Sequence, residues 1–392
     1  MKETNLKPGW RWVRLEDVAT AYSKRVSDPA NSEYERFVSS EHMDRFDQKV
    51  KRWGKASDIS SSKKAFEPGD YLFVGRSLYA SDFRERAARA DFPGVSSNGI
   101  IAIREKPGMV ADGFLSAVLN HPQIWKFVVK NATGTLTRYV YWKTLKEFEF
   151  ALPPPEEQRR IVEVLQGEQQ TNEALREAQI RLTQVRESMG IDIWGNKEIT
   201  LHMVPLGELS IKIQDGTHFS PHSKEGDYRY ITSKNIRNGF LDISTAGWIS
   251  KDEHDGIYKR CDVKKGDLLL TKDGVNAGNI AINTLDEPFS LLSSVVFIRP
   301  DSTKLDPIYL FEYIRSRIGR TRLLAYVKGS AISRLTLTQI RRFKVPLMDI
   351  EVQHQYASQL SQIQSSIDQL SNRRSNFRVF SKCVRQILED ST

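Results

Sequence analysis

Two short stretches of this sequence combine residue types that catalysis could use. Asp306 to Tyr309 reads DPIY, which is close to the Asp-Pro-Pro-Tyr tetrapeptide of amino-methyltransferases but lacks its second proline. Asp as the N-cap and Pro as the first residue of a helix explain the same letters, so we favour a structural role. Asp255, followed by Asp262-Val-Lys264, loosely matches the acid and lysine pattern of metal-dependent nucleases. A pattern this short arises often by chance.

No other catalytic motif is visible. The sequence contains no Gly-x-Gly, so it has no dinucleotide fingerprint, and no Walker A lysine follows a glycine loop. No metal site is expected among the seven histidines. His218, in the polar stretch DGTHFSPH, is more typical of a solvated or DNA-facing side chain than of a ligand. No nucleophile-elbow pattern supports a charge-relay triad. The residues therefore favour binding over catalysis.

Composition indicates a folded, soluble protein of two or three domains, with 392 residues, 39% of them hydrophobic and 27% charged. The longest apolar run, near Leu291 to Ile298, is too short to cross a membrane, and no secretory signal is visible at the N-terminus. Two cysteines, Cys261 and Cys383, make neither a disulfide framework nor a zinc site, which favours the cytoplasm.

The sequence repeats itself at a spacing near 195 residues. Ile103-Arg104 falls on Ile298-Arg299, and each pair ends an apolar run that is typical of a buried strand. Upstream, EPGDYLFV matches KKGDLLLT at an offset of 197, and at the front WRWVRLEDVAT pairs with HMVPLGELSIK. Further matches at 195 are Leu115 with Leu310, Gly134 with Gly329, Phe148 with Phe343, Glu156 with Glu351, and Gln158 with Gln353. A repeat of this length indicates a duplicated domain.

Each copy ends in a long predicted helix. LPPPEEQRRIVEVLQG begins at Leu152 and LMDIEVQHQYASQLSQ at Leu347; prolines suit the approach to a helix, and Glu156 and Glu157 suit its positive end. Narrow apolar stripes follow, interrupted by Asn172, Arg374 and Ser381, and their steps of four and three indicate a heptad seam that needs a partner helix. The alternative is that each helix packs only on its own domain. The predicted pairing residues are Ile161, Leu165, Leu175, Leu182, Met189, Tyr356, Leu360, Ile363, Ile367, Leu370 and Phe377.

We therefore predict an α+β protein in which two β-rich domains in tandem are each followed by a long helix, and the two helices pair as an antiparallel coiled coil. The predicted boundaries are 1–155 and 198–350 for the β-rich domains, and 156–197 and 351–392 for the helical segments. The net charge of +9 lies in the β-rich parts, because the helical segments together carry −1. A basic balance alone is only a weak indication of nucleic-acid binding.

The chain resembles the specificity subunit of type I restriction-modification enzymes. The resemblance rests on FALPPPEEQRRIVEVL, on IQDGTHFSPHSKEGDYRYITSKNIRNGFLD, and on KGDLLLTKDG, LLSSVVFIRP and KGSAISRLT. It covers essentially the whole chain and is weaker in the first module, where DGTH has no counterpart and TGTLTRYV only approximates the Gly-Ser loop.

The resemblance implies a non-catalytic subunit that binds double-stranded DNA. Each of two target-recognition domains would read one half of a split site, while the paired helices set the spacer and dock two modification (methyltransferase) subunits. Restriction and motor subunits join in the nuclease form. No cofactor is expected in this chain, because S-adenosylmethionine and ATP would belong to the partner subunits.

Residues predicted to contact DNA have side chains suited to base edges or phosphates and lie in the loops of the matching segments. In the second module they are His218, Lys234, Asn235, Lys272, Asn276, Lys328, Ser330 and Arg334, and in the first Arg76, Ser96, Asn98, Lys130, Thr135 and Arg138. For Asn98 and Asn235 the alternative is a turn-forming role. The alternative functions are a basic scaffold that binds acidic proteins, and a nuclease or methyltransferase in its own right.

Overall fold

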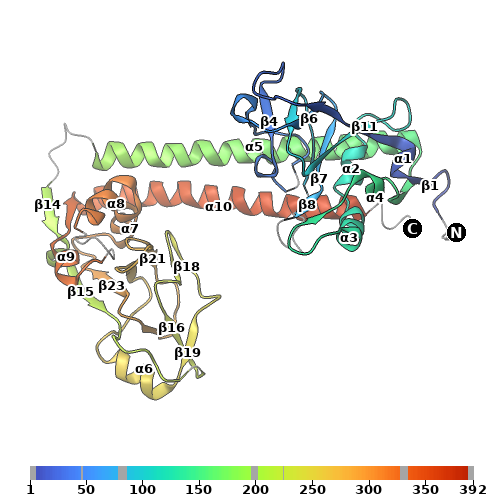
Figure 1. Cartoon of the computed structure of the whole chain (residues 1–392). Coiled ribbons are helices and arrows are strands. Elements are labelled where there is room, and N and C mark those ends of the chain that lie inside the picture. Colours follow the sequence, from blue (N-terminus) through green and yellow to red (C-terminus); the bar gives the residue numbers. More distant parts are fainter. Residues whose placement is uncertain are drawn as a thin grey trace. The chain divides into compact units, whose positions relative to one another are not determined.

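The computed structural model of the chain describes residues 6–45, 47–77, 86–195, 202–223, 225–326 and 334–386, the last eleven of them by backbone only (Figure 1). The chain forms two compact units, one of residues 1–176 and 372–392 and the other of residues 177–371. Each unit holds one β-rich module together with parts of two long helices, α5 (Pro155–Trp194) and α10 (Ile350–Gln386). The predicted fold class is confirmed.

The first module contains a four-stranded sheet in the order β2-β11-β7-β9, a five-stranded sheet in the order β3-β6-β10-β4-β5, and the pairs β1-β13 and β8-β12. Its elements are β1 (Arg11–Arg14), α1 (Leu15–Val18), β2 (Ala19–Tyr22), β3 (Lys24–Val26), β4 (Arg36–Val38), β5 (Gly54–Lys55), β6 (Lys63–Phe66), β7 (Tyr71–Val74), β8 (Arg76–Ser77), β9 (Ala87–Arg89), β10 (Gly94–Ser96), β11 (Ile100–Glu105), α2 (Leu115–Leu119), α3 (Pro122–Asn131), β12 (Arg138–Tyr139), α4 (Trp142–Leu145) and β13 (Glu149–Leu152).

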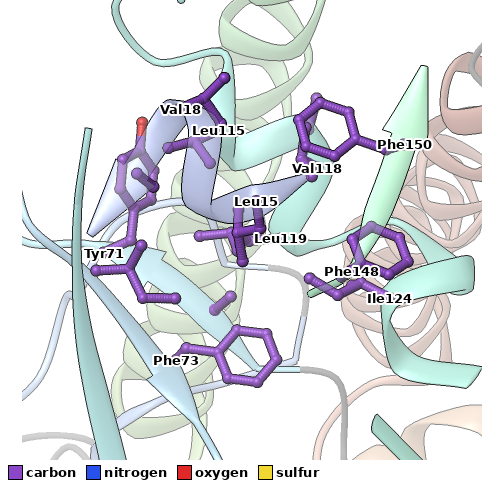
Figure 2. Close-up of a cluster of buried hydrophobic side chains, with 14 of the residues drawn as sticks. Leu15, Val18, Tyr71, Phe73, Leu115, Val118, Leu119, Ile124, Phe148 and Phe150 are labelled. Carbon is purple, nitrogen blue, oxygen red and sulfur yellow. The ribbon is translucent and has the colours of Figure 1, made fainter. Parts of the chain in front are cut away.

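Strand β7 separates two apolar cores in this module. Successive side chains of a strand point to opposite faces, and all four residues of YLFV are buried. Tyr71 and Phe73 pack with α1, α2 and α3, a cluster shown in Figure 2, whereas Leu72 and Val74 pack on the other face with Phe66. A strand buried on both faces reads as a continuous apolar run, which is why it was recognisable in the sequence.

The second module repeats this arrangement with sheets in the orders β15-β23-β20-β21 and β19-β16-β22, and the pairs β14-β24 and β17-β18. Its elements are β14 (His202–Pro205), β15 (Ser210–Asp215), β16 (Tyr228–Ile231), β17 (Ile236–Arg237), β18 (Phe240–Leu241), β19 (Gly247–Ile249), α6 (Lys251–Tyr258), β20 (Leu268–Thr271), β21 (Ile280–Ile282), β22 (Ser290–Leu291), β23 (Val295–Pro300), α7 (Pro307–Arg315), α8 (Arg317–Leu324), α9 (Leu337–Arg342) and β24 (Lys344–Leu347).

Equivalent hydrogen bonds tie the modules together as copies. Arg104 holds the buried Asp70 with two bonds of 2.6 and 2.9 Å, and Arg299 holds the buried Asp267 with two bonds of 2.8 Å. At the front of the repeat the structure corrects the sequence pairing by one residue. Arg11 pairs with Leu152 as His202 pairs with Leu347, which is an offset of 191 and not the 192 implied by aligning the two quoted stretches.

A buried glutamine docks each long helix onto its own module. Gln158 accepts a hydrogen bond from the N–H of Ala111 at 2.8 Å and donates to the carbonyl of Pro153 at 2.8 Å. Gln353 accepts from the N–H of Asp306 at 3.0 Å and donates to the carbonyl of Met348 at 2.8 Å. The shared Gln of the two helix starts is therefore an anchor between helix and module.

The predicted pairing residues lie in different environments. Ile161 and Leu165 lie in the core of the first module, so they dock α5 onto that module. Tyr356 and Leu360 of α10 share the core of the second module with Met189 and the neighbouring Ile193 and Trp194 of α5. Farther along, the stripe continues as half-buried residues, namely Leu175, Leu182, Ile363, Ile367 and Leu370; the side chain of Phe377 lies outside the described residues.

The two helices run antiparallel. The end of α5 meets the start of α10 in the core of the second unit. In the first unit, Asn172 near the middle of α5 accepts a hydrogen bond from Arg374 near the end of α10, with 3.2 Å between Nε and Oδ1. Two of the residues that interrupt the apolar stripes in the sequence are therefore hydrogen-bonded to each other.

Candidate nucleic-acid interface

Loops at one end of the second module converge on residues 292–294. The N–H of Leu292 donates to the carbonyl of Ile231, the N–H of Ser293 to that of Thr217, and the N–H of Lys272 to the carbonyl of Ser294. Asp273 forms an isolated bridge with Arg334. We call this convergence the loop edge of the second module; it consists of residues 216–218, 231–234, 272–276, 292–294 and 334.

The first module builds the same loop edge from residues 38–41, 75–76, 97–99 and 133–139. The N–H of Ser97 donates to the carbonyl of Val38 at 2.9 Å, and that of Gly75 to the carbonyl of Gly99 at 2.9 Å. Strand β8 then pairs with β12, which places Arg76 opposite Tyr139 with the guanidinium 5.6 Å from the ring centroid. Loops far apart in the sequence therefore meet at one edge in both copies.

Glycines permit the close approach of these loops. Gly134 has φ of +111°, and a Cβ there would lie 2.2 Å from the carbonyl oxygen of Thr137. A Cβ on Gly216, in the DGTH stretch, would lie 1.9 Å from the carbonyl oxygen of Leu291. Both positions therefore require glycine, for different reasons: backbone conformation at the first and contact with a neighbouring strand at the second.

A buried carboxylate organises the loop edge of the second module. Asp215 accepts a hydrogen bond from Nζ of Lys272 at 2.7 Å, and each of these side chains is only 4% exposed. His218 lies 3.6 Å and Arg260 3.9 Å from the same carboxylate, and Arg260 also donates to the carbonyl of Gly216. Four residues thus fix the loop that carries His218 at the surface.

The structure gathers most of the residues predicted for the first module. Arg76, Asn98 and Thr135 are exposed at the loop edge, and Arg138 is half-buried there, donating to the carbonyl of Ala132 at 2.7 Å. Lys130 is exposed in the last turn of α3. The DNA-contact role predicted for Ser96 is wrong, because Ser96 is fully buried in β10, where its hydroxyl donates to the carbonyl of Lys64.

The residues predicted for the second module divide in a similar way. His218, Lys234 and Arg334 are exposed at the loop edge, and Asn276 is half-buried there. A contact role is wrong for the buried Lys272, which pairs with Asp215, and for Asn235, which is 1% exposed and closes a turn as its alternative interpretation held. Lys328 and Ser330 lie outside the described residues.

The first module contains a matching turn that was not predicted from the sequence. Asn235 closes the turn after β16 by accepting from the N–H of Thr232 at 2.9 Å, and Nδ1 of His42 accepts from the N–H of Ser39 at 3.0 Å after β4. In the sequence, RFVSSEHM and RYITSKNI align at an offset of 193. That offset differs from the others and His replaces Asn, so the match was hidden.

The same offset relates two stacked arginines. Arg36 lies over the ring of Trp53 at 4.4 Å, and Arg229 lies over the ring of Trp248 at 4.5 Å. Both tryptophans are 40–45% exposed, so each stack presents a cationic and aromatic surface. Arg and Trp side chains of this kind also serve nucleic-acid contacts.

The stretches that could do chemistry have structural roles. Asp306 caps α7 by accepting from the N–H of Tyr309 at 2.8 Å, with Pro307 first in the helix. Asp262 pairs with Lys212 and Arg299, and Asp255 pairs with Lys251. His218 and His222 have the His-x-x-x-His spacing, so the absence of a metal site does not follow from the spacing of the histidines. The two residues lie in a loop and not on one helix face.

Within the described part of the chain, no group of three His, Cys, Asp or Glu residues could hold a metal ion. In the same residues, no helix has the length and apolar character that a membrane crossing needs. Each copy of the duplicated module has one loop edge, which is held together by equivalent backbone hydrogen bonds.

Comparisons with known proteins relate the chain to DNA specificity subunits. Residues 199–376 match the family model of the type I restriction modification DNA specificity domain. Over 141 residues, 36% of this chain, it is 30% identical to the type I restriction enzyme EcoBI specificity subunit of Escherichia coli, and covers 29% of that protein. Over 147 residues, 36% of this chain, it is 28% identical to the MjaVIII specificity subunit of Methanocaldococcus jannaschii, and covers 30% of it. The chain thus spans about a third of these relatives.

Solved structures share the fold over nearly the entire chain. One, from work on complex assembly and conformational transition of the type I R-M system, has a TM-score of 0.61 at 18% identity and covers 98% of both chains. The type I S subunit from M. genitalium has a TM-score of 0.59 at 14% identity, with 99% of this chain and 97% of that chain covered. The resemblance to type I specificity subunits is confirmed.

Proposed function

We propose that this protein is the sequence-specific DNA-recognition subunit of a type I restriction-modification complex. The observation that carries the proposal is the loop edge, which is built twice from equivalent hydrogen bonds in a chain that matches the family model of a DNA specificity domain. Each module would read one half of a bipartite target through its own loop edge. Because the two modules are tethered, binding of one half-site raises the effective concentration of the other module at the second half-site.

The antiparallel helices suit the role of a spacer. A helix rises 1.5 Å per residue and is stiff, so a paired rod would allow one distance between two half-sites where a flexible linker would allow many. The helices would also dock two methyltransferase subunits, and motor-restriction subunits would join them in a nuclease form. S-adenosylmethionine and ATP would be bound by those partners, and this chain would contribute recognition without catalysis, in the cytoplasm.

The combination of cationic and neutral polar side chains at the loop edges supports DNA over an acidic protein as the ligand. Exposed arginine, lysine, asparagine and threonine side chains combine cations for phosphates with the amides and hydroxyls that read base edges. A scaffold for acidic proteins would need the cations alone. This alternative is therefore not favoured.

Selection from a randomised duplex library tests the proposal. The full-length chain is expected to enrich a motif of two short defined halves separated by an unread spacer of fixed length. Binding to the selected duplex should exceed binding to random duplex by about a thousand-fold or more at one salt concentration. Equal binding to both duplexes would contradict the proposal and support the scaffold.

A further inference from the structure

Glu41 and Lys234 occupy the same position in the two modules. Each lies in the turn after the strand that pairs in parallel with β10 or β22, where Val95 faces Phe37 as Ser290 faces Tyr230. The N–H of Glu41 donates to the hydroxyl of Ser39 at 3.3 Å, and the N–H of Lys234 donates to the hydroxyl of Thr232 at 3.3 Å. The duplication has thus conserved the turn while reversing the charge at its tip.

Both side chains are free to meet a ligand. Glu41 and Lys234 are exposed, and within the described residues neither makes a side-chain hydrogen bond or ion pair. Their turns are rigid, because His42 and Asn235 close them and the strand before each turn is bonded to the loop edge. A rigid turn with an unpaired charge at its tip is suited to selective contact, since little ordering is needed on binding.

The acidic residue is the informative member of this pair. A carboxylate at an edge that faces DNA is repelled by the phosphates, so its presence there is unfavourable unless it accepts a hydrogen bond from a base. In the major groove, Glu and Asp accept from the exocyclic amino group of cytosine, whereas Lys donates to the acceptors of guanine. A phosphate contact could explain Lys234 but cannot explain Glu41.

We propose that Glu41 and Lys234 are specificity-determining residues that read opposite bases in the two half-sites. Glu41 selects a cytosine through its exocyclic amino group in the first half, and Lys234 selects a guanine in the second. This inference rests on the proposed function. It makes the target asymmetric at the base pairs that correspond through the duplication, even though the two turns have the same backbone.

Exchange of the two charges tests the inference. Selection from randomised duplexes is carried out with the full-length wild type and with Glu41→Lys and Lys234→Glu. Glu41→Lys should replace the preferred cytosine by guanine at one position of one half, and Lys234→Glu should do the reverse in the other half. The preference at that position should change by about 10-fold or more, as for one base contact.

Matched controls separate this inference from the proposed function. Glu149→Gln and Lys304→Gln each remove an exposed charge outside the loop edges and should leave the motif unchanged. Glu149 lies on β13 and pairs with Arg14, and Lys304 lies before α7 and pairs with Asp301. Glu41→Gln keeps the size of the side chain and should lower the cytosine preference. If selection with the wild type enriched no motif, the proposed function would be overturned. A wild-type motif that Glu41→Lys and Lys234→Glu both leave intact would overturn the inference alone.

Discussion

Asn172 of α5 and Arg374 of α10 are hydrogen-bonded to each other at 3.2 Å, and both are half-buried. Each is a polar residue that interrupts the apolar stripe of its helix. A polar residue at a seam position costs stability but selects one alignment of the helices, because any other alignment leaves it facing apolar side chains. The pair therefore has the properties of a device that fixes helix register.

Replacing both residues should raise the stability of the protein and weaken the preference for one helix register. The double variant Asn172→Leu and Arg374→Leu is expected to raise the thermal midpoint and to broaden the spacer length in the selected DNA motif. The single variant Asn172→Leu should be less stable than the double variant, since it leaves Arg374 without this acceptor. An unchanged midpoint together with one sharp spacer would exclude a register role.

The buried glutamines Gln158 and Gln353 should be among the most sensitive positions of the helices. Alanine at either one of these buried positions removes the partner of a backbone N–H and of a backbone carbonyl, which costs up to about 1–3 kcal/mol for each group left unsatisfied. Urea unfolding would measure the loss. The exposed Gln362 of α10 is the matched control, and its replacement by alanine should change the free energy of unfolding by less than about 0.5 kcal/mol.

Protonation of His42 should weaken the first module alone. Burial, and then the charge of Arg52, lower the pKa of His42 below its ordinary value of about 6.5. The unfolded chain therefore takes up a proton at higher pH than the folded one, so the free energy of unfolding falls as pH drops below about 6.5. Below the folded-state pKa, Nδ1 can no longer accept from the N–H of Ser39.

DNA binding between pH 8 and pH 5.5 would measure this effect. Discrimination at the first half-site should decline with acidity, while the second half-site, whose turn is closed by Asn235, should not respond through this group. The variant His42→Asn copies the second module and should remove the difference. A pH response that survives in this variant would assign the effect to another group.

The buried pair of Lys272 and Asp215 should matter more than a surface ion pair. Lys272→Met removes the buried cation that is hydrogen-bonded to Asp215 and leaves Arg260 at 3.9 Å as the nearest permanent positive charge; breaking a buried pair typically costs about 3–5 kcal/mol. The double variant Lys272→Met with Asp215→Leu should recover much of this stability but not the position of the loop that carries His218. Thermal unfolding measures the stability, and sequence selectivity at the second half-site reports the position of the loop. Equal stability of the single and double variants would contradict the expected recovery.

Much of the architecture could be predicted because its signals are long or repeated. The buried strands read as apolar runs, and the seam of Leu360, Ile363 and Ile367 keeps its steps of four and three. The docking of Ile161 and Leu165 onto the first module could not be predicted, because an apolar helix residue looks the same whether it faces a helix or a sheet.

The loop edges were predicted only in part, for two physical reasons. Polar residue types in a loop do not reveal burial. The sequence therefore cannot distinguish a DNA contact from the observed roles of Lys272, which pairs with a carboxylate, and Asn235, which closes a turn. Insertions also change the offset between copies from 197 to 193 and 191. The turn of Glu41 thus lay out of step with that of Lys234 until β4 and β16 aligned them.

The central claim is that two modules read two half-sites independently. Its most direct measurement is methylation mapping by long-read sequencing in cells that carry this chain and its methyltransferase, before and after residues 198–350 are exchanged for those of a relative. Independent reading by the two modules predicts that one half of the methylated motif changes while the other half and the spacer stay as they were. A motif altered in both halves by this single exchange would contradict it.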